Sequence, residues 1–289
     1  MGSKAIVSLI VAVFFAVVAF LQNNGVLPEN LNPVANGEVY LHIIDVGQGS
    51  STLIQQGSEA ILIDAGEYDY ALVVADYINS CGIETLKYVV ASHPHSDHIG
   101  GFPKVIEKYK PGEVLMPEIA EENLPTTKTY ERFLDAIYDN EITASYCEVG
   151  DVYYMGDVEM EILGPVEQTD DLNNMSAICK ISVGDTDVMV LGDAEKQELK
   201  SVYNYGGDFE SEILVMGHHG SRTSIQKDFL SAVNPELGLI SCGTDNSYGH
   251  PHEETIDYLE ENGIDYERTD YSGSLVYRIN AYGYERVEK

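Results

Sequence analysis

Three histidines and an aspartate lie within the six-residue segment "HPHSDH", at His93, His95, Asp97 and His98. Histidine is otherwise sparse, with eight in 289 residues. Imidazole and carboxylate groups together suit zinc, and less selectively iron or manganese. In the alternative, Asp97 only caps a helix that begins at Ile99, and the histidines are exposed loop residues. Four such residues so close together favour a metal site.

The elements around this segment are suited to positioning ligands. It follows "LKYVVAS", an apolar strand, and α/β proteins commonly place ligands at the end of such a strand. Pro94 keeps the loop out of a helix, because the residue before a proline avoids helical geometry. Successive extended residues alternate in direction, so His93 and His95 are expected to point the same way. Asp97 then turns toward the same place as the next helix begins.

Strand and helix patterns alternate from residue 37 to the end of the chain. Strands are expected at residues 38–46, 51–55, 60–66, 86–92, 144–149, 152–156, 158–164, 212–217, 237–243, 265–270 and 273–279, with a hairpin at 176–193. Helices are expected at residues 70–82, 99–112, 129–140, 224–233 and 252–263, and after residue 194. This order fits two mixed sheets covered by helices in one domain at residues 37–289.

The amino terminus has a different composition. Residues 5–21 are an uncharged apolar run of 17 residues after Lys4. At ~1.5 Å per residue, the run is near the lower limit for spanning a bilayer. We predict that residues 1–22 are a signal peptide or a membrane anchor, and we favour the anchor. Residues 23–36, rich in Asn, Pro and Gly, are the expected linker, and the domain would lie outside the cytoplasm.

The charge of the chain limits its partners. There are 16 basic and 48 acidic residues, which give a formal net charge of −32. Such a chain has no basic surface for nucleic acid, so a long nucleic acid is not the expected partner. The four cysteines are widely spaced, and Cys179 and Cys242 lie in apolar runs. Both are therefore expected to be buried free thiols.

The pattern His-x-His-x-Asp-His resembles the metal-binding signature of the metallo-β-lactamase-fold hydrolases. Four more segments look like the hydrolase domain of the bacterial competence DNA-uptake channel ComEC. They are residues 41–54 with "ILIDAG", 173–195, 213–224 and 247–275. The resemblance implies an αββα sandwich of two mixed β-sheets flanked by helices, with the active site at one edge between the sheets.

Two positions depart from the ComEC pattern. That family commonly has an aspartate where this chain has His95, and histidine there restores the ligand signature of two-metal enzymes. It also commonly has an acidic residue where Ser50 stands, so no role carries over to that position. One hydrophobic segment cannot form a DNA channel, so the transport role does not carry over either.

The resemblance implies two metal sites that share Asp193, whose carboxylate has an oxygen for each ion. The alternative for Asp193 is a helix N-cap. The first predicted site comprises His93, His95, Asp193 and one of His218 and His219, and the second comprises Asp97, His98, Asp193 and His250. Two divalent ions are expected, with zinc favoured over manganese or iron.

The adjacent histidines of "GHHGS" are the candidate catalytic residues. Consecutive residues at a strand end point in opposite directions, so only one of His218 and His219 is expected to face the metals. We favour His219, because Gly220 after it would let a substrate approach the backbone closely. The inward histidine could donate a hydrogen bond to a phosphoryl oxygen or protonate the leaving group.

Four further residues are assigned around the site. Asp64 matches a family aspartate beside the metals and is expected to orient ligands through hydrogen bonds. The family's usual histidine is missing at "LNNMSA", where Asn174 or a neighbour would orient water or substrate. Ser221 and Arg222 follow "GHHGS", and Arg222 is a candidate phosphate contact, with an ordinary surface arginine as the equal alternative.

The expected charges suggest a substrate. Two divalent ions, two aspartates and a bridging hydroxide leave a single positive charge, which suits a phosphodiester monoanion and also tolerates a neutral lactam, thioester or lactone. We predict a binuclear phosphodiesterase that acts on a small or cell-surface substrate outside the cytoplasm, similar to phosphorylcholine esterases or nucleases. The alternatives are a metallohydrolase of another ester or amide bond and a non-catalytic surface-binding module.

Overall fold

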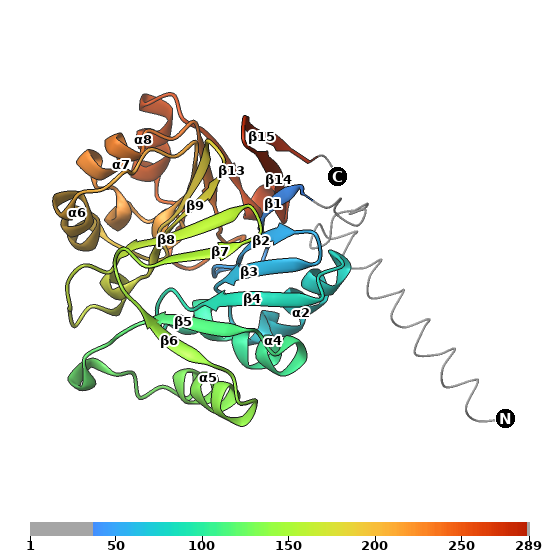
Figure 1. Cartoon of the computed structure of the whole chain (residues 1–289). Helices are drawn as coiled ribbons and strands as arrows, with labels where there is room; N and C mark the ends of the chain where they lie inside the picture. Colours follow the sequence, from blue (N-terminus) through green and yellow to red (C-terminus); the bar gives the residue numbers. More distant parts are fainter. Residues whose placement is uncertain (1–36, 288–289) are drawn as a thin grey trace.

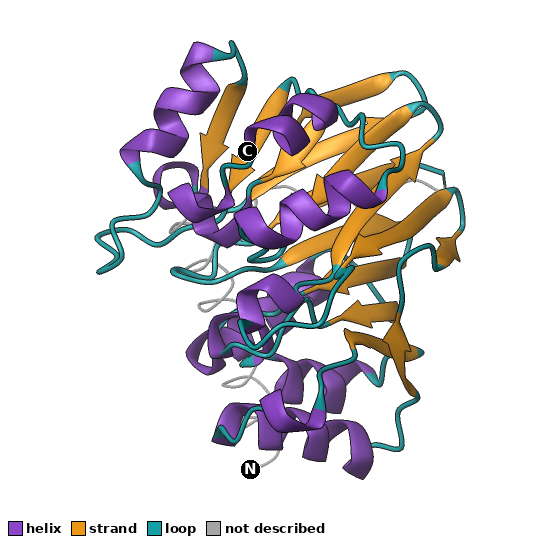
Figure 2. Cartoon of the chain, turned by 90° about the vertical axis from the view of Figure 1, so that its left-hand side faces the viewer, coloured by secondary structure: helices purple, strands orange, loops and turns teal. Residues whose placement is uncertain are grey.

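Two β-sheets lie face to face, with helices on both outer sides, in the computed structural model of the chain (Figure 1, Figure 2). The structure describes residues 37–287. The predicted anchor at residues 1–22 and the predicted linker at 23–36 lie outside the described residues. Across residues 37–287, none of the helices combines the length and the apolar character needed to cross a membrane.

Both sheets are mixed, as the sequence predicts. Within the described residues, the first sheet has eight strands in the spatial order β15 (Gly283–Arg286), β14 (Leu275–Asn280), β1 (Val39–Ile43), β2 (Thr52–Gln56), β3 (Glu59–Ile63), β4 (Thr85–Val90), β5 (Glu113–Pro117) and β6 (Ala144–Cys147). The second has seven described strands in the order β13 (Asp265–Arg268), β12 (Leu237–Ile240), β11 (Ile213–Val215), β10 (Thr186–Val190), β9 (Ile178–Val183), β8 (Val158–Gly164) and β7 (Val152–Met155). Strands β3 to β6 pair in parallel, and so do β10 to β13.

Helices connect the parallel strands. The α-helices are α2 (Ala71–Ser80), α3 (Ser96–Ile99), α4 (Phe102–Tyr109), α5 (Lys128–Asp139), α6 (Lys196–Tyr205), α7 (Lys227–Val233), α8 (Glu253–Glu261) and α9 (Thr269–Ser272). The short 3-10 helices are η1 (Tyr68–Tyr70), η2 (Glu121–Asn123), η3 (Leu172–Met175), η4 (Gly217–Gly220) and η5 (Arg222–Ser224). Parallel neighbours need such crossovers, because a tight turn cannot join them.

Each sheet contributes side chains to two different cores, one on each of its faces. On β3, Ile61 and Ile63 pack in the core between the sheets, and Ala60 and Leu62 pack under the helices of the first sheet. Successive residues of a strand point to opposite faces, so a strand covered on both sides is apolar throughout. The continuous apolar run in the sequence therefore follows from this four-layer arrangement.

The longer helices cover the two outer faces of the sandwich (Figure 1, Figure 2). Helices α2, α4 and α5 cover the first sheet, where Phe102 packs on Phe133 with ring centroids 5.5 Å apart. Helices α6, α7 and α8 cover the second sheet through residues that include Phe229 and Leu259. The described residues thus form the αββα sandwich that the sequence resemblance implies.

The structure contains two strands that the sequence analysis misses. Strand β5, at "EVLMP", is short and lies between two helical patterns. Strand β15 follows a tight turn near the carboxyl terminus and pairs with β14, which returns to the first sheet beside β1. Cys179 and Cys242 are free and buried, as expected.

Candidate metal centre

The predicted ligands converge at one end of the sandwich, where three strands of the two sheets end. His93 to His98 follow β4, Asp193 follows β10, and His218 and His219 follow β11. Ligand sites in α/β proteins commonly lie outside the carboxyl ends of parallel strands, where successive loops meet. Residues that are far apart in the sequence therefore share one site.

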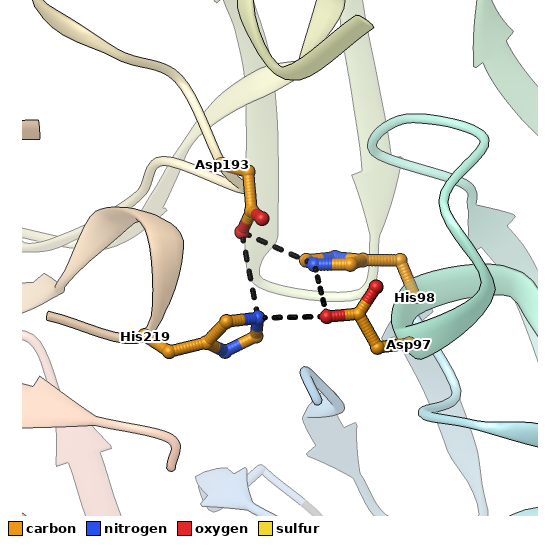
Figure 3. A group of neighbouring side chains, drawn as sticks. All are labelled: Asp97, His98, Asp193 and His219. Carbon is orange, nitrogen blue, oxygen red and sulfur yellow. Dashed lines mark hydrogen bonds and ion pairs between the residues drawn. The ribbon is translucent and has the colours of Figure 1, made fainter. Parts of the chain in front are cut away.

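Asp97, His98, Asp193 and His219 each offer one ligand atom, and these atoms all lie within 4.8 Å of one another (Figure 3). We call these four residues the tight set. Nε2 of His98 is 3.1 Å from Oδ1 of Asp193, and Nε2 of His219 is 3.1 Å from Oδ2 of Asp97. Nε2 of His219 is also 3.8 Å from Oδ1 of Asp193. The side chains thus surround a small common space.

The donor chemistry of the tight set fits a divalent metal ion. Nε2 of His98 and Oδ1 of Asp193 are buried and lie 3.1 Å apart, yet neither atom forms a hydrogen bond of good geometry within the described part of the chain. A buried polar group without a partner costs roughly 1–3 kcal/mol, so two such atoms facing one space need an explanation. Two imidazoles and two carboxylates are ligands that zinc, iron and manganese accept. A bound ion would satisfy both atoms.

A second, more open group of donors lies on the other side of Asp193. Nε2 of His93 is 3.8 Å and Nε2 of His218 is 3.6 Å from Oδ2 of Asp193, and Nε2 of His93 is 3.0 Å from Nδ1 of His95. We call His93, His95, Asp193 and His218 the open set. Asp193 thus directs Oδ1 toward the tight set and Oδ2 toward the open set.

Backbone hydrogen bonds hold the ligand loop against the first sheet. The amide of Ser50 donates to the carbonyl of Asp97 at 3.0 Å, and the amide of Ala65 donates to the carbonyl of His98 at 2.8 Å. The chain at Gly49 passes so close that a Cβ there would meet the Asp97 carbonyl at 2.7 Å. The loop is therefore fastened by main-chain contacts that do not depend on the side chain at Ser50.

Asp64 lies where the predicted orienting role requires it. It is fully buried, and its carboxylate accepts hydrogen bonds from the amide and the hydroxyl of Ser92 at 2.9 and 2.7 Å. Nδ1 of His98 is 2.7 Å from Oδ2 of Asp64. With Nδ1 held by this carboxylate, a metal ion that displaces the proton of Nε2 would find a lone pair directed at the centre of the tight set. Asp64 has a φ of 61°, an uncommon conformation that these contacts maintain.

The site opens into a cleft of about 590 Å³. Its walls carry hydroxyl and amide groups of Thr127, Thr129, Asn173 and Gln48, and Tyr248 lies at its edge. No lysine or arginine is among the described residues that line this cleft. A substrate arm would therefore meet mainly neutral hydrogen-bonding groups.

Comparison with known proteins places this fold and site in a family. Residues 44–244 match the Metallo-beta-lactamase superfamily. The chain belongs to this superfamily.

Two curated relatives are competence proteins, in agreement with the predicted resemblance. Competence protein ComA of Neisseria gonorrhoeae is 32% identical over 86% of this chain and 34% of its own length. ComE operon protein 3 of Bacillus subtilis is 27% identical over 85% of this chain and 34% of its own length. The chain spans about a third of the length of these relatives.

A solved structure of the superfamily shares the fold. YhfI from Bacillus subtilis, described as a metallo-beta-lactamase fold protein, matches with a TM-score of 0.57 at 14% identity. The match covers 83% of this chain and 100% of YhfI. The chain is thus a metallo-beta-lactamase superfamily hydrolase with a candidate site for a divalent metal.

The metal-free site holds mixed protonation states. Burial lowers the pKa of His98 and of His219, but the neighbouring carboxylates, Asp193 foremost, outweigh it and raise both pKa values, so a bound ion would have to displace protons from these two imidazoles. Burial raises the pKa of Asp193, but the imidazoles of His98 and His219 outweigh it and hold the pKa well below its usual range. Burial lowers the pKa of His93 well below its usual value. An ionised carboxylate and a neutral imidazole are the forms that bind metal.

Both histidines of "GHHGS" face Asp193, so the expectation that they point in opposite directions is wrong. They do not continue β11, because His218 (φ 50°, ψ 47°) and His219 (φ 55°, ψ 28°) adopt left-handed conformations in η4. Alternation holds only for an extended backbone. Both histidines line the cleft, but His219 is buried and its Nδ1 donates to the carbonyl of Ser241 at 3.0 Å, whereas the side chain of His218 is partly exposed.

His250 does not join the tight set, and His219 occupies the place predicted for it. The ring of His250 lies 5.4 Å from that of His218, and burial lowers its pKa to about 4. Asn246 holds this loop, because its side chain bonds the amide and the carbonyl of His250 at 2.9 and 2.6 Å. The loop therefore keeps His250 at the wall of the cleft, where its Nδ1 lies 3.3 Å from the side-chain Nε2 of Gln48.

Asn174 does not line the cleft and instead caps helix α6. Its Oδ1 accepts hydrogen bonds from the amides of Glu195 and Glu198 at 3.1 and 3.2 Å. Because the start of the helix uses this side chain, the predicted role in orienting water or substrate does not hold for Asn174 itself, and the alternative that a neighbour has this role stays a prediction. Its neighbour Asn173 lines the cleft.

Ser221 and Arg222 also lie away from the cleft. Ser221 is buried, and its hydroxyl is 2.9 Å from that of Thr223. The side chain of Arg222 is 57% exposed and lies 3.6 Å from Glu254. The surface alternative for Arg222 therefore describes the structure better than the predicted phosphate contact.

The sequence analysis misses one acidic residue of the site. Oε1 of Glu195 lies 3.2 Å from Nδ1 of His218. The available signal was its position two residues after Asp193. Its proximity to His218 depends on the turn in η4, and no local sequence pattern predicts that turn.

Proposed function

We propose that this chain is a binuclear metal-dependent phosphodiesterase that acts outside the cytoplasm. The observation that carries the proposal is the geometry of Asp193, which directs one oxygen to each of two donor groups. Membership of the superfamily accounts for hydrolysis as the reaction class.

Individual residues of the site support this chemistry through their charge and through the orientation of the ligands. Two bound divalent ions would polarise the phosphoryl group and lower the pKa of a water molecule. Asp97 and Asp193 offset part of the ionic charge, so the site suits a single negative charge on the substrate. Asp64 keeps the His98 ring oriented, which maintains the geometry between turnovers.

The cleft favours a small substrate over a long polyanion. The described lining residues include no lysine or arginine, and the chain has a net charge of −32. Contacts between basic residues and phosphates normally dominate nucleic-acid affinity, so a long strand would bind weakly. A phosphodiester with neutral polar arms suits the threonine and amide groups of the walls. Tyr248, which is 66% exposed, offers one aromatic face to a choline group or a base.

Metal analysis followed by a substrate screen tests the proposal. Purified residues 37–289 should bind about two divalent ions, by the ligand argument above. The preparation is then assayed with bis(p-nitrophenyl) phosphate, p-nitrophenylphosphorylcholine, a short oligonucleotide, a β-lactam and a thioester. Hydrolysis of a phosphodiester is expected. Turnover of only the lactam or the thioester would assign another bond class, and absence of metal after reconstitution would favour a binding module.

The proposed location has its own test. We propose that residues 5–21 direct the chain to the membrane and that the domain lies on the outer side. Cell fractionation and protease treatment of intact cells should find the domain membrane-associated and accessible. A cytosolic, protease-protected chain would contradict this part of the proposal.

A further inference from the structure

We infer that Glu195 is a positioning residue that holds His218 in the tautomer with the proton on Nδ1, so that Nε2 becomes the fourth donor of the open set. This inference rests on the proposed binuclear function. It also decides between two roles that the sequence leaves open for His218, because a ring that presents a lone pair at Nε2 binds metal and does not donate a hydrogen bond there.

The contacts on the two ring nitrogens of His218 differ in kind. Nδ1 lies 3.2 Å from Oε1 of Glu195 and 3.3 Å from the hydroxyl of Thr223, and both oxygens can accept its proton. Nε2 lies 3.6 Å from Oδ2 of Asp193, on the side of the open set. A neutral imidazole carries one proton. Both nitrogens face a carboxylate, but Nδ1 is nearer to its partner, at 3.2 Å from Glu195 against 3.6 Å between Nε2 and Asp193, so Nδ1 retains the proton. The lone pair is therefore left on Nε2.

The start of helix α6 shows that the Glu195 side chain is available for this role. Glu195 occupies the N-cap position, where a side chain often accepts from the first amides of the helix, yet within the described residues it forms no such bond. Asn174 accepts instead from the amide of Glu198 in the first turn and from the amide of Glu195 itself. The carboxylate turns toward the cleft, where Nδ2 of Asn173 lies 3.5 Å from the same Oε1.

The same arrangement occurs in the tight set. Asp64 holds Nδ1 of His98 at 2.7 Å, and the opposite nitrogen faces Asp193. Glu195 and His218 form a similar but longer contact, at 3.2 Å, on the other oxygen of Asp193. The pair would give the open set four donors even though the family histidine expected at "LNNMSA" is missing from this chain.

Stepwise zinc titration of the purified full chain against a chelating indicator tests the inference. Glu195→Ala should weaken the second bound ion by about 10–100-fold, the usual effect of removing a partner behind a ligating histidine, and leave the first unchanged. Glu195→Gln should lose less, because its amide oxygen still accepts from Nδ1. Glu254→Ala, which removes a glutamate from the first turn of α8 and outside the cleft, is the matched control and should match the parent.

Imidazole nitrogen NMR of the metal-free full chain gives a readout that does not depend on metal. The His218 signals, assigned by their loss in His218→Asn, should show the proton on Nδ1 in the parent and a shift toward Nε2 in Glu195→Ala. A proton on Nε2 in the parent would overturn the inference, as would equal metal affinities in Glu195→Ala and Glu254→Ala. If the parent shows the expected tautomer but binds fewer than two ions, the binuclear function fails and the positioning by Glu195 stands.

Discussion

The tight set and the open set share Asp193 but differ in how firmly the fold holds them. In the tight set, His98 and His219 are buried, and each ring is anchored through Nδ1 by Asp64 or by the carbonyl of Ser241. In the open set, His93 is buried, but His218 is held through Nδ1 only by longer contacts, at 3.2 and 3.3 Å. Exposure does not separate the sets, because the side chain of Asp97 is 29% exposed and that of His218 is 22% exposed. Packing around a ligand reduces the freedom that binding must remove.

This difference suggests a division of labour between the two sets. The tight set is preorganised and should bind its ion first and release it slowly. Residues of both sets line the cleft, but the imidazole of His218 is less firmly held, so the ion of the open set should exchange more readily. Substitutions in each set test whether the two sets differ in this way.

Substitution of the shared residue should have the largest effect. Asp193→Asn removes the charge and one of the two carboxylate oxygens that face the sets. We expect both ions to be lost and phosphodiester turnover to fall by at least about 10³, equal to roughly 4 kcal/mol of transition-state stabilisation. Elemental analysis and initial rates measure this. Retention of both ions would contradict the shared role.

Substitution of one ligand in either set should remove one ion and leave the other bound. Asp97→Ala should remove the ion of the tight set, and His95→Ala should remove that of the open set, so each variant retains one ion. The loss of affinity at the damaged site should exceed the about 10–100-fold typical of an outer partner. Zinc titration of both variants, with His252→Ala as a control outside the cleft, distinguishes the sites. Equal damage to both ions in each variant would mean that the sets are not separate.

Removal of an orienting group should have a smaller effect, confined to one set. Asp64→Asn weakens the charge that holds Nδ1 of His98, so affinity for the ion of the tight set should fall by about 10–100-fold. Asn174→Ala is the control for the tight set, because it removes a helix cap worth about 1 kcal/mol. Its effect on metal, through Glu195, should be confined to the ion of the open set. Asp64→Asn should therefore lower the metal affinity of the tight set, whereas Asn174→Ala should lower the free energy of unfolding and leave that affinity unchanged. A similar metal loss in Asn174→Ala would undermine the distinction.

The smallest effect concerns stability and pH behind the site. Burial raises the pKa of Glu198 to about 7 in the folded chain, above its usual 4.5. The folded state thus holds this proton more tightly than the unfolded state, so the stabilisation is complete below about pH 4.5 and is lost as pH rises through about 7. Glu198→Gln keeps an acceptor for the amide of Val166 but cannot ionise.

The free energy of unfolding of Glu198→Gln, relative to the parent, should therefore rise by about 1–2 kcal/mol between pH 5 and pH 8. Chemical denaturation of the metal-free proteins at the two pH values measures this difference. A constant difference would show that Glu198 does not titrate in this range.

The sequence alone determined the kinds of donor and the layers of the fold. His93, His95, Asp97 and His98 share one loop, so their proximity follows from spacing after a buried strand. The apolar run of β3 predicts burial on both faces, and the structure places Ile61 and Leu62 in two different cores. These features depend on periods of a few residues, which a sequence displays directly.

The tertiary structure decided which donors meet. His219 replaces His250 in the tight set because η4 turns through left-handed conformations, where strand alternation does not apply. Glu195 reaches His218 because Asn174 caps α6 from another segment. The return of β14 and β15 to the first sheet is likewise a pairing across most of the chain. Each outcome depends on contacts between residues distant in sequence, and the spacing of nearby residues does not predict such contacts.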